Sequence, residues 1–270
     1  MGSDIRLLVL DIDGTIAGDS NEVSPTVIDA ITTAKAKGVK VAIATGRMYQ
    51  SALRFHQVIG SDMPLAAYQG AILRDPRTDE LHHHYHLPSE MAQTLLYTLA
   101  QFPLEAIHVY VNDNLYIQAK NPLSDWYAER SRVQLHLIED LNGQGALPPT
   151  KVLGMTQDTQ LIDELLEIMR AQFPPDQLYL TKSLPTFFEA THPGINKGIA
   201  VKYMAEDLLG LAPEQVMVVG DSYNDVEMFD YAGTAVAMGN AEAPVKARSS
   251  WQAPSIDEDG VAAAIEEFIR

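Results

Sequence analysis

Four short polar clusters contain carboxylate, hydroxyl, amide and ammonium side chains, the groups that bind cations and anions. They are Asp11-Ile12-Asp13-Gly14-Thr15, Thr45-Gly46, Lys197, and Gly220-Asp221-Ser222-Tyr223-Asn224-Asp225. Each cluster alone has an ordinary explanation, such as an Asx-turn, a helix cap or a solvated lysine on a helix. Because all four occur in one chain, each after a candidate strand or at the start of a candidate helix, they indicate a single site.

Asp11, Asp13, Asp221 and Asp225 would bring four negative charges together. Such a cluster needs a counter-ion. The chain has no cysteine and no obvious histidine ligand near these positions. A carboxylate-rich site with only oxygen ligands suits a hard cation, so we expect Mg²⁺.

The remaining groups suit a phosphoryl anion. Mg²⁺ and Lys197 would leave one formal negative charge on the four carboxylates before any substrate binds. Candidate donors to phosphate are the backbone amides of Ile12 and Gly46, the Thr45 hydroxyl, the Lys197 ammonium and the Asn224 side chain. Gly14 permits a tight turn that brings backbone amides close to the anion. The pattern predicts phosphoryl-transfer chemistry.

These clusters require elements that carry them to one place. Apolar runs predict strands at residues 5–10, 39–44, 65–68, 216–219 and 234–238, and helical spacing predicts helices at 23–37, from 47 to about 59, and 197–209. Strand and helix alternate, so we expect an α/β fold with a doubly wound, mostly parallel Rossmann-like sheet. Ligands bind outside the carboxyl ends of such strands, where the clusters fall.

The middle of the chain has a different pattern. We expect a helix at 87–102, a hairpin at 106–119, a strand at 151–155, a helix at 158–173, and short strands at 178–181 and 186–189. This α+β order favours antiparallel pairing. The sequence therefore predicts a catalytic core from residues 1–84 and 190–270, interrupted by an α+β cap domain at 85–189.

The clusters resemble the four motifs of the haloacid dehalogenase superfamily, specifically its Cof-type phosphatases of subclass IIB, which carry a large α+β cap. The resemblance implies that Asp11 is the nucleophile and Asp13 the general acid/base. One departure is Gln69-Gly70-Ala71, where such proteins often have Asn before Gly-Ala.

The same resemblance implies roles for the other motif residues. Asp11, Asp221 and the backbone carbonyl of Asp13 would hold Mg²⁺, and Asp225 would support the metal. Thr45 and Lys197 would steady the phosphoryl group, and Asn224 would contact it.

The predicted function is a Mg²⁺-dependent phosphatase that hydrolyses a small phosphate monoester, a sugar phosphate or similar metabolite, through an aspartyl phosphate. The alternatives are a phosphomutase of the same superfamily and a non-enzymatic receiver module, which would not need Asp13 as an acid. Arg47, Glu189 and Asn196 are candidate substrate contacts. The run His82-His83-His84-Tyr85-His86 suggests zinc, but strand alternation splits its imidazoles between two faces, so a solvated strand is favoured.

Composition and hydropathy limit the partners and the location that we expect for this protein. A net charge of −17 argues against a nucleic-acid partner, which needs clustered Lys and Arg. No apolar run approaches the roughly 18–20 residues of a membrane span, and Asp11 and Asp13 end the first apolar stretch too early for a signal peptide. We expect a cytoplasmic protein that acts on a small phosphorylated metabolite, with no membrane partner.

Overall fold

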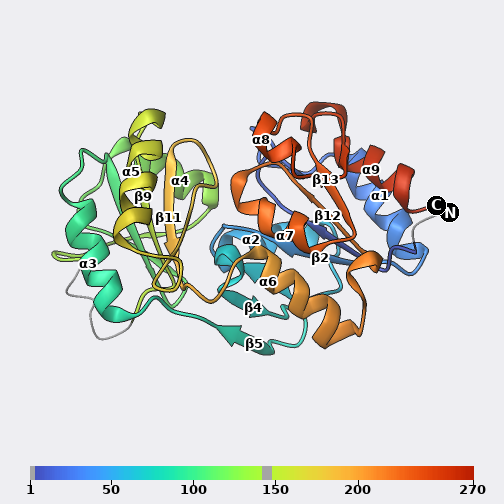
Figure 1. Cartoon of the computed structure of the whole chain (residues 1–270), viewed down its shortest axis with the longest axis horizontal. Coiled ribbons are helices and arrows are strands. Elements are labelled where there is room, and N and C mark those ends of the chain that lie inside the picture. Colours follow the sequence, from blue (N-terminus) through green and yellow to red (C-terminus); the bar gives the residue numbers. More distant parts are fainter. Residues whose placement is uncertain (1–3, 142–147) are drawn as a thin grey trace. The chain divides into compact units, whose positions relative to one another are not determined.

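The computed structural model describes residues 4–141 and 148–270, and these residues form two compact units (Figure 1). Met1–His82 and Asn196–Arg270 make up the first, here called the core unit, and His83–Ile195 make up the second, here called the inserted unit. The predicted α/β fold with an inserted α+β segment is confirmed.

An eight-stranded sheet runs through the core unit in the order β14-β13-β12-β1-β2-β3-β4-β5. Its strands are β1 (Leu7–Leu10), β2 (Lys40–Ala44), β3 (Leu65–Ala67), β4 (Ile72–Arg74), β5 (Leu81–His84), β12 (Val216–Gly220), β13 (Thr234–Ala237) and β14 (Trp251–Gln252). The strands from β14 through β3 pair in parallel, and β4 pairs antiparallel with β3. The central strand β1 pairs with both β2 and β12, so the first and last motif-bearing strands lie side by side.

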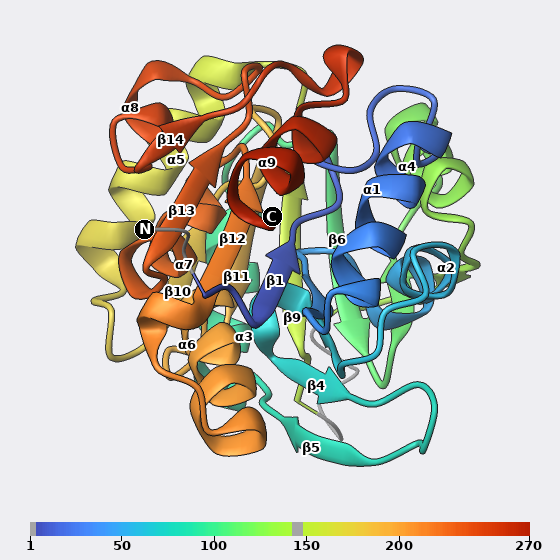
Figure 2. The ribbon, with the colours of Figure 1, turned by 90° about the vertical axis from the view of Figure 1, so that its right-hand side faces the viewer.

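Helices cover both faces of this sheet, which explains why the central strands β1 and β12 are apolar and buried along their whole length (Figure 2). Leu8 and Leu10 of β1 pack with α1 (Pro25–Ala36), α2 (Tyr49–Val58) and α9 (Gly260–Phe268). Leu7 and Val9 face the opposite layer, which holds α6 (Lys197–Lys202), α7 (Val226–Tyr231) and α8 (Ala243–Lys246). All four leucine and valine side chains of β1 are fully buried.

Two element boundaries show how local sequence sets the fold. Ser24 caps α1 by accepting a hydrogen bond from the Val27 amide, and proline occupies the first helical position. The predicted helix at 197–209 is α-helical only to Lys202 and continues as a π-helical segment, Tyr203–Leu208.

The inserted unit has a six-stranded sheet in the order β10-β11-β9-β6-β7-β8. Its strands are β6 (Ala106–Val111), β7 (Asn114–Ile117), β8 (Leu135–Leu137), β9 (Lys151–Met155), β10 (Tyr179–Thr181) and β11 (Phe187–Thr191), and its helices are α3 (Ser89–Leu99), α4 (Pro122–Ser131) and α5 (Thr159–Gln172). All pairs are antiparallel except β7 with β8. Helices α3 and α5 pack on one face through a shared apolar cluster.

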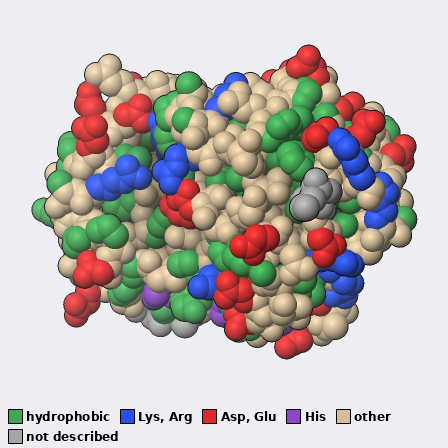
Figure 3. All heavy atoms as spheres, turned by 45° about the vertical axis from the view of Figure 1, so that its right-hand side comes forward, with side chains coloured by type: hydrophobic (Ala, Val, Ile, Leu, Met, Phe, Trp, Pro, Cys, Tyr) green, Lys and Arg blue, Asp and Glu red, His purple; other side chains and the backbone are tan. Residues whose placement is uncertain are grey.

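Within the described residues, no helix combines the length and the apolar character needed to span a membrane. On the face seen in Figure 3, acidic and basic side chains are interspersed between apolar and neutral ones.

Candidate active site

A buried lysine joins two strand ends of the core unit. Lys197, the first residue of α6, is fully buried and donates to Oδ1 of Asp11 at 2.7 Å and to Oδ1 of Asp225 at 2.6 Å. Asp11 directly follows β1, and Asp225 lies in the short 3₁₀ turn, Tyr223–Asp225, after β12. The second oxygen of Asp225 accepts from the backbone amides of Asp221 and Ser222, so this carboxylate shapes the loop as well as the charge of the site.

Asp221 lies beside the Asp11-Asp13 turn because Gly14 leaves room for it. Gly14 has φ +75°, and a Cβ at that position would overlap the Asp221 carboxylate, so only glycine fits. Oδ1 of Asp221 accepts a long hydrogen bond of 3.4 Å from the Thr15 hydroxyl. Oδ2 accepts from the Asn240 side chain at 3.2 Å, and Asn240 also donates to the Gly14 carbonyl.

The buried carboxylates outnumber their lysine, and their protonation reflects this. Burial raises the pKa of Asp11 to about 7 against the pull of Lys197, and the charges of Asp225 and Asp13 push in the same direction as burial. Burial likewise raises the pKa of Asp221 well above its usual range, with Asp225 and Asp11 adding to the rise. Burial alone would lower the pKa of Lys197, but Asp11 and Asp225 outweigh it and raise it.

This arrangement fits a divalent cation. One oxygen from each of Asp11, Asp221 and Asp225 lies within 4.8 Å of the others, and no other group of three such ligands occurs in the described ranges. All the donors are carboxylate oxygens, the ligands of hard cations. A bound cation would favour the ionised carboxylates and so lower the raised pKa values of Asp11 and Asp221.

The Asp13 carboxylate takes a different partner. Arg47 donates from Nε to Oδ2 of Asp13 at 2.7 Å and from a terminal nitrogen to Oδ1 at 2.6 Å. The Arg47 side chain is 8% exposed and the Asp13 side chain 26%. Arg47, predicted as a candidate substrate contact, is thus a close partner of the candidate acid.

The candidate phosphate donors line the same edge of the sheet. Ile12 is fully buried, and its carbonyl accepts from the Ile16 and Ala17 amides, which closes the turn after β1. Thr45, buried after β2, accepts from the Arg47 amide through its hydroxyl. Asn224 is buried and donates to Oε1 of Gln69 at 3.0 Å.

Gln69 is a functional candidate that sequence reasoning treated only as a departure. Tyr68, Gln69 and Gly70 all have positive φ, which ends β3 at Ala67, and all three are buried. A Cβ on Gly46 would overlap the Gln69 side-chain nitrogen, so Gln69 packs directly on the Thr45-Gly46 backbone. Gln69 therefore links Thr45-Gly46 with Asn224, two of the predicted phosphate-binding elements. Its position just after β3 is the sequence feature that could have identified it as a site residue.

Two other candidates have local partners. Asn196 caps α6, with its side chain accepting from the Ile199 amide at 2.9 Å. Glu189 belongs to the inserted unit, where its carboxylate pairs with Lys151 at 3.3 Å and accepts from the Ser183 hydroxyl. Asn240 contacts Asp221 but was not predicted; it follows β13, so the strand-end rule could have found it. Thr15, a member of the first predicted cluster, also contacts Asp221.

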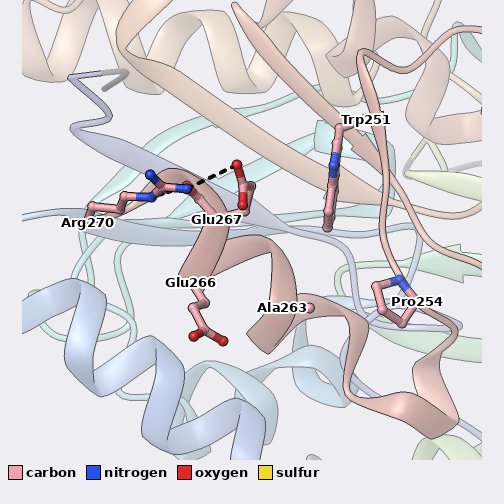
Figure 4. A pocket seen from close by; sticks show the side chains of 6 residues that line it. All are labelled: Trp251, Pro254, Ala263, Glu266, Glu267 and Arg270. Carbon is pink, nitrogen blue, oxygen red and sulfur yellow. Dashed lines mark hydrogen bonds and ion pairs between the residues drawn. The ribbon is translucent and has the colours of Figure 1, made fainter. Parts of the chain in front are cut away.

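A surface pocket of about 460 Å³ lies elsewhere on the core unit, between β14 and α9 (Figure 4). Its lining consists of Trp251, Pro254, Ala263, Glu266, Glu267 and Arg270. None of these is a predicted site residue, and Arg270 pairs with Glu267 rather than facing an open anion site.

Comparisons with known proteins agree with this geometry. The family model of haloacid dehalogenase-like hydrolases matches residues 8–265. The 5-amino-6-(5-phospho-D-ribitylamino)uracil phosphatase YcsE of Bacillus subtilis is 30% identical over 98% of this chain and 96% of its own. The pyridoxal phosphate phosphatase YbhA of Escherichia coli is 26% identical, covering 91% of this chain and 92% of its own. The structure of the subclass IIB sugar phosphatase BT4131 superposes with a TM-score of 0.83 at 23% identity, over 98% of this chain and 100% of that one.

The chain belongs to the haloacid dehalogenase-like hydrolases, the superfamily that its motifs predicted. It is a hydrolase of phosphoric monoesters.

Proposed function

We propose that this protein is a Mg²⁺-dependent phosphatase that cleaves a small phosphate monoester through a phospho-aspartate at Asp11. The observation that carries the proposal is the buried cluster of Asp11, Asp221 and Asp225 around the single ammonium of Lys197. Its surplus of negative charge suits a divalent cation, and the cation with Lys197 suits a phosphoryl group.

In the first step, an oxygen of Asp11 forms a bond to phosphorus while the bond from phosphorus to the ester oxygen breaks. Lys197 holds Oδ1 of Asp11, which favours Oδ2 as the attacking atom. Asp13 donates its carboxyl proton to the departing alkoxide, so an alcohol leaves. Asp11, Asp221 and the Asp13 carbonyl, with support from Asp225, would hold Mg²⁺, which would supply positive charge to neutralise the phosphoryl oxygens.

In the second step, the Asp13 carboxylate takes a proton from water as the water oxygen bonds to phosphorus. The bond between phosphorus and Asp11 breaks, inorganic phosphate leaves, and Asp13 is protonated for the next cycle. During both steps Lys197, the Ile12 and Gly46 amides, the Thr45 hydroxyl and the Asn224 side chain orient the phosphoryl oxygens.

Substrate choice is a separate matter, because the core residues recognise phosphate alone. YcsE is named as a phosphatase of 5-amino-6-(5-phospho-D-ribitylamino)uracil, and YbhA is named as a phosphatase of pyridoxal phosphate. We propose a small metabolite of similar size, sugar phosphates first, as the substrate. We further propose that residues 85–189 form a specificity cap in which Glu189 contacts the leaving group, and that Asn196 contributes mainly as the helix cap before Lys197.

A phosphate-release screen against a panel of phosphorylated metabolites, with Mg²⁺ and with excess EDTA, tests this proposal. We expect release from a subset of the panel, only with Mg²⁺, and without a bisphosphate activator. Full activity after verified metal removal would contradict the metal role. Conversion to an isomeric sugar phosphate instead of free phosphate would favour a mutase.

A further inference from the structure

The guanidinium of Arg47 and the carboxylate of Asp13 form a two-pronged ion pair. Nε and a terminal nitrogen of Arg47 each donate to a different oxygen of Asp13, at 2.7 and 2.6 Å. A fork of this kind fixes the plane of a carboxylate as well as its position, which a single-point contact from lysine would not do.

Arg47 is itself fixed by the surrounding core unit. The terminal nitrogen that contacts Asp13 also donates to the Asn21 side-chain oxygen at 2.8 Å, and the other lies 3.4 Å from the Ser51 hydroxyl. The guanidinium carbon lies 4.7 Å from the centre of the Phe55 ring. Asn21 has φ +57°, a conformation that asparagine tolerates well. These contacts set the direction from which Arg47 reaches Asp13.

Charge explains why Asp13 needs this partner. Asp13 lies close enough to raise the pKa of both Asp11 and Asp221, so these carboxylates repel one another. A free Asp13 side chain would favour rotamers that point away from them. With a divalent cation and Lys197, one formal negative charge would remain on Asp11, Asp13, Asp221 and Asp225, and Arg47 balances it.

We propose that Arg47 is a positioning residue that holds the Asp13 carboxylate in its working orientation for proton transfer. This inference rests on the proposed function, in which Asp13 exchanges a proton with the leaving group and then with water. Each carboxylate oxygen has two lone pairs, so an oxygen that accepts from Arg47 can still carry the transferred proton.

The geometry separates this role from substrate contact. Nε and both terminal nitrogens of Arg47 lie within hydrogen-bond distance of side chains of the core unit, and only 8% of the side chain is exposed. A residue that bound the leaving group would mainly change KM. A residue that positions Asp13 would change the proton-dependent chemical steps.

The test is single-turnover phosphorylation of the Mg²⁺-loaded enzyme by an alkyl phosphate and by p-nitrophenyl phosphate. Nitrophenolate leaves without a proton, whereas an alkoxide needs one. For Arg47→Met we expect the rate to fall at least ~10-fold more with the alkyl ester than with p-nitrophenyl phosphate, within the ~10²–10⁴-fold range of general acid catalysis. Arg47→Lys, which keeps the charge but lacks the fork, falls between this variant and the wild type.

Arg54→Met is the matched control. Arg54 lies 4.0 Å over the same Phe55 ring and donates to the Asn21 carbonyl at 2.9 Å, and it forms an ion pair with Glu22 at 3.8 Å. Arg54→Met removes a guanidinium from the same packing environment but does not disturb the fork. We therefore expect the ratio of the alkyl-ester rate to the p-nitrophenyl phosphate rate to stay at the wild-type value. Thermal unfolding of each variant shows whether it is folded.

A double mutant decides whether Arg47 acts through Asp13. In the Asp13→Ala background, Arg47→Met should change the alkyl-ester rate by less than ~2-fold, because the group it positions is gone. The inference would be overturned if Arg47→Met lowered the rate equally with both esters. It would also be overturned if adding Arg47→Met to Asp13→Ala lowered the alkyl-ester rate as much as it does in the wild type. Wild-type release of phosphate from either ester tests the proposed function separately, so failure of one is not failure of the other.

Discussion

Both units bury charged side chains, but they do so in different ways. In the core unit, the carboxylates of Asp11, Asp221 and Asp225 share one buried ammonium, that of Lys197. In the inserted unit, Lys151 pairs with Glu189, whose other oxygen accepts from Ser183. The core cluster therefore has a surplus of negative charge, whereas the Lys151–Glu189 ion pair joins one positive and one negative group.

The difference separates a cluster that calls for a cation from an ion pair that can stay buried without one. A balanced and hydrogen-bonded pair can be buried without any further partner. A surplus of buried carboxylates is tolerated only through raised pKa values or a bound cation. We therefore expect changes in the core cluster to alter chemistry and metal binding, and changes in the inserted pair to alter stability and substrate preference.

The largest expected effect is on turnover. Asp11→Asn should lower kcat at least ~10³-fold with every substrate, about 4 kcal/mol of barrier, because no phospho-enzyme can form. The matched variant Glu189→Gln should lower kcat/KM by ~10-fold or less, and unevenly between substrates. Steady-state kinetics on three or more esters measure both. Substantial kcat in purified, Mg²⁺-loaded Asp11→Asn enzyme would show that Asp11 is not the nucleophile.

The second effect is on stability, and its sign differs between the units. Glu189→Ala removes the carboxylate that pairs with the buried Lys151 ammonium and should destabilise the inserted unit by about 3–5 kcal/mol. Asp221→Asn removes one of several repelling charges and should stabilise the metal-free core unit. Fragment-resolved hydrogen exchange assigns each change to a unit. A metal-free core unit made less stable by Asp221→Asn would contradict the charge-surplus argument.

The third effect is on pH dependence. The folded pKa of Asp11 is raised from 3.8 to about 7, so its contribution to stability is present below pH 3.8 and is lost as the pH rises through 7. His108 of the inserted unit behaves oppositely. Burial, helped by Lys151, lowers its pKa from 6.5 to about 3, so its contribution is present above pH 6.5 and is lost as the pH falls toward 3.

Metal-free protein should therefore lose core-unit stability between about pH 4 and 7, and Mg²⁺ should restore it most at neutral pH. The inserted unit should lose stability as the pH falls from 6.5, and His108→Gln should reduce that loss. Hydrogen exchange at several pH values, with and without Mg²⁺, provides the measurement. An effect of Mg²⁺ that is equal at pH 4 and pH 7 would contradict the assignment to Asp11.

The smallest effect concerns Gln69. Gln69→Asn suits the left-handed backbone at φ +60° but shortens the side chain, so the hydrogen bond from Asn224 is lost or lengthened. We expect KM to rise by ~3–10-fold, the scale of one neutral hydrogen bond, with the metal requirement unchanged. Asn224→Ala should raise KM further. A Gln69→Asn enzyme with wild-type KM would show that Asn224 needs no support from this loop.

Much of the fold was predictable because strand ends and helix caps are local features. The apolar runs at 5–10 and 216–219 predicted two strands, and the structure pairs them as β1 and β12. The fork between Arg47 and Asp13 was not predictable, since hydrogen-bond direction depends on side-chain rotamers and on Asn21, which no motif includes. The partner of Glu189 was missed for the same reason, because Lys151 lies in a different strand.

The proposed mechanism depends on a covalent phospho-aspartate at Asp11, and trapping this intermediate tests it. Asp13→Ala enzyme with Mg²⁺ is mixed with p-nitrophenyl phosphate, quenched in acid and digested for mass spectrometry. This ester needs no leaving-group proton, whereas hydrolysis of the phospho-aspartate needs Asp13, so the intermediate should accumulate. The account predicts that the peptide containing Asp11 gains one phosphoryl group and that Asp11→Asn/Asp13→Ala enzyme gains none. Phosphate release with no labelled peptide, or a phosphoryl group on another residue, would contradict it.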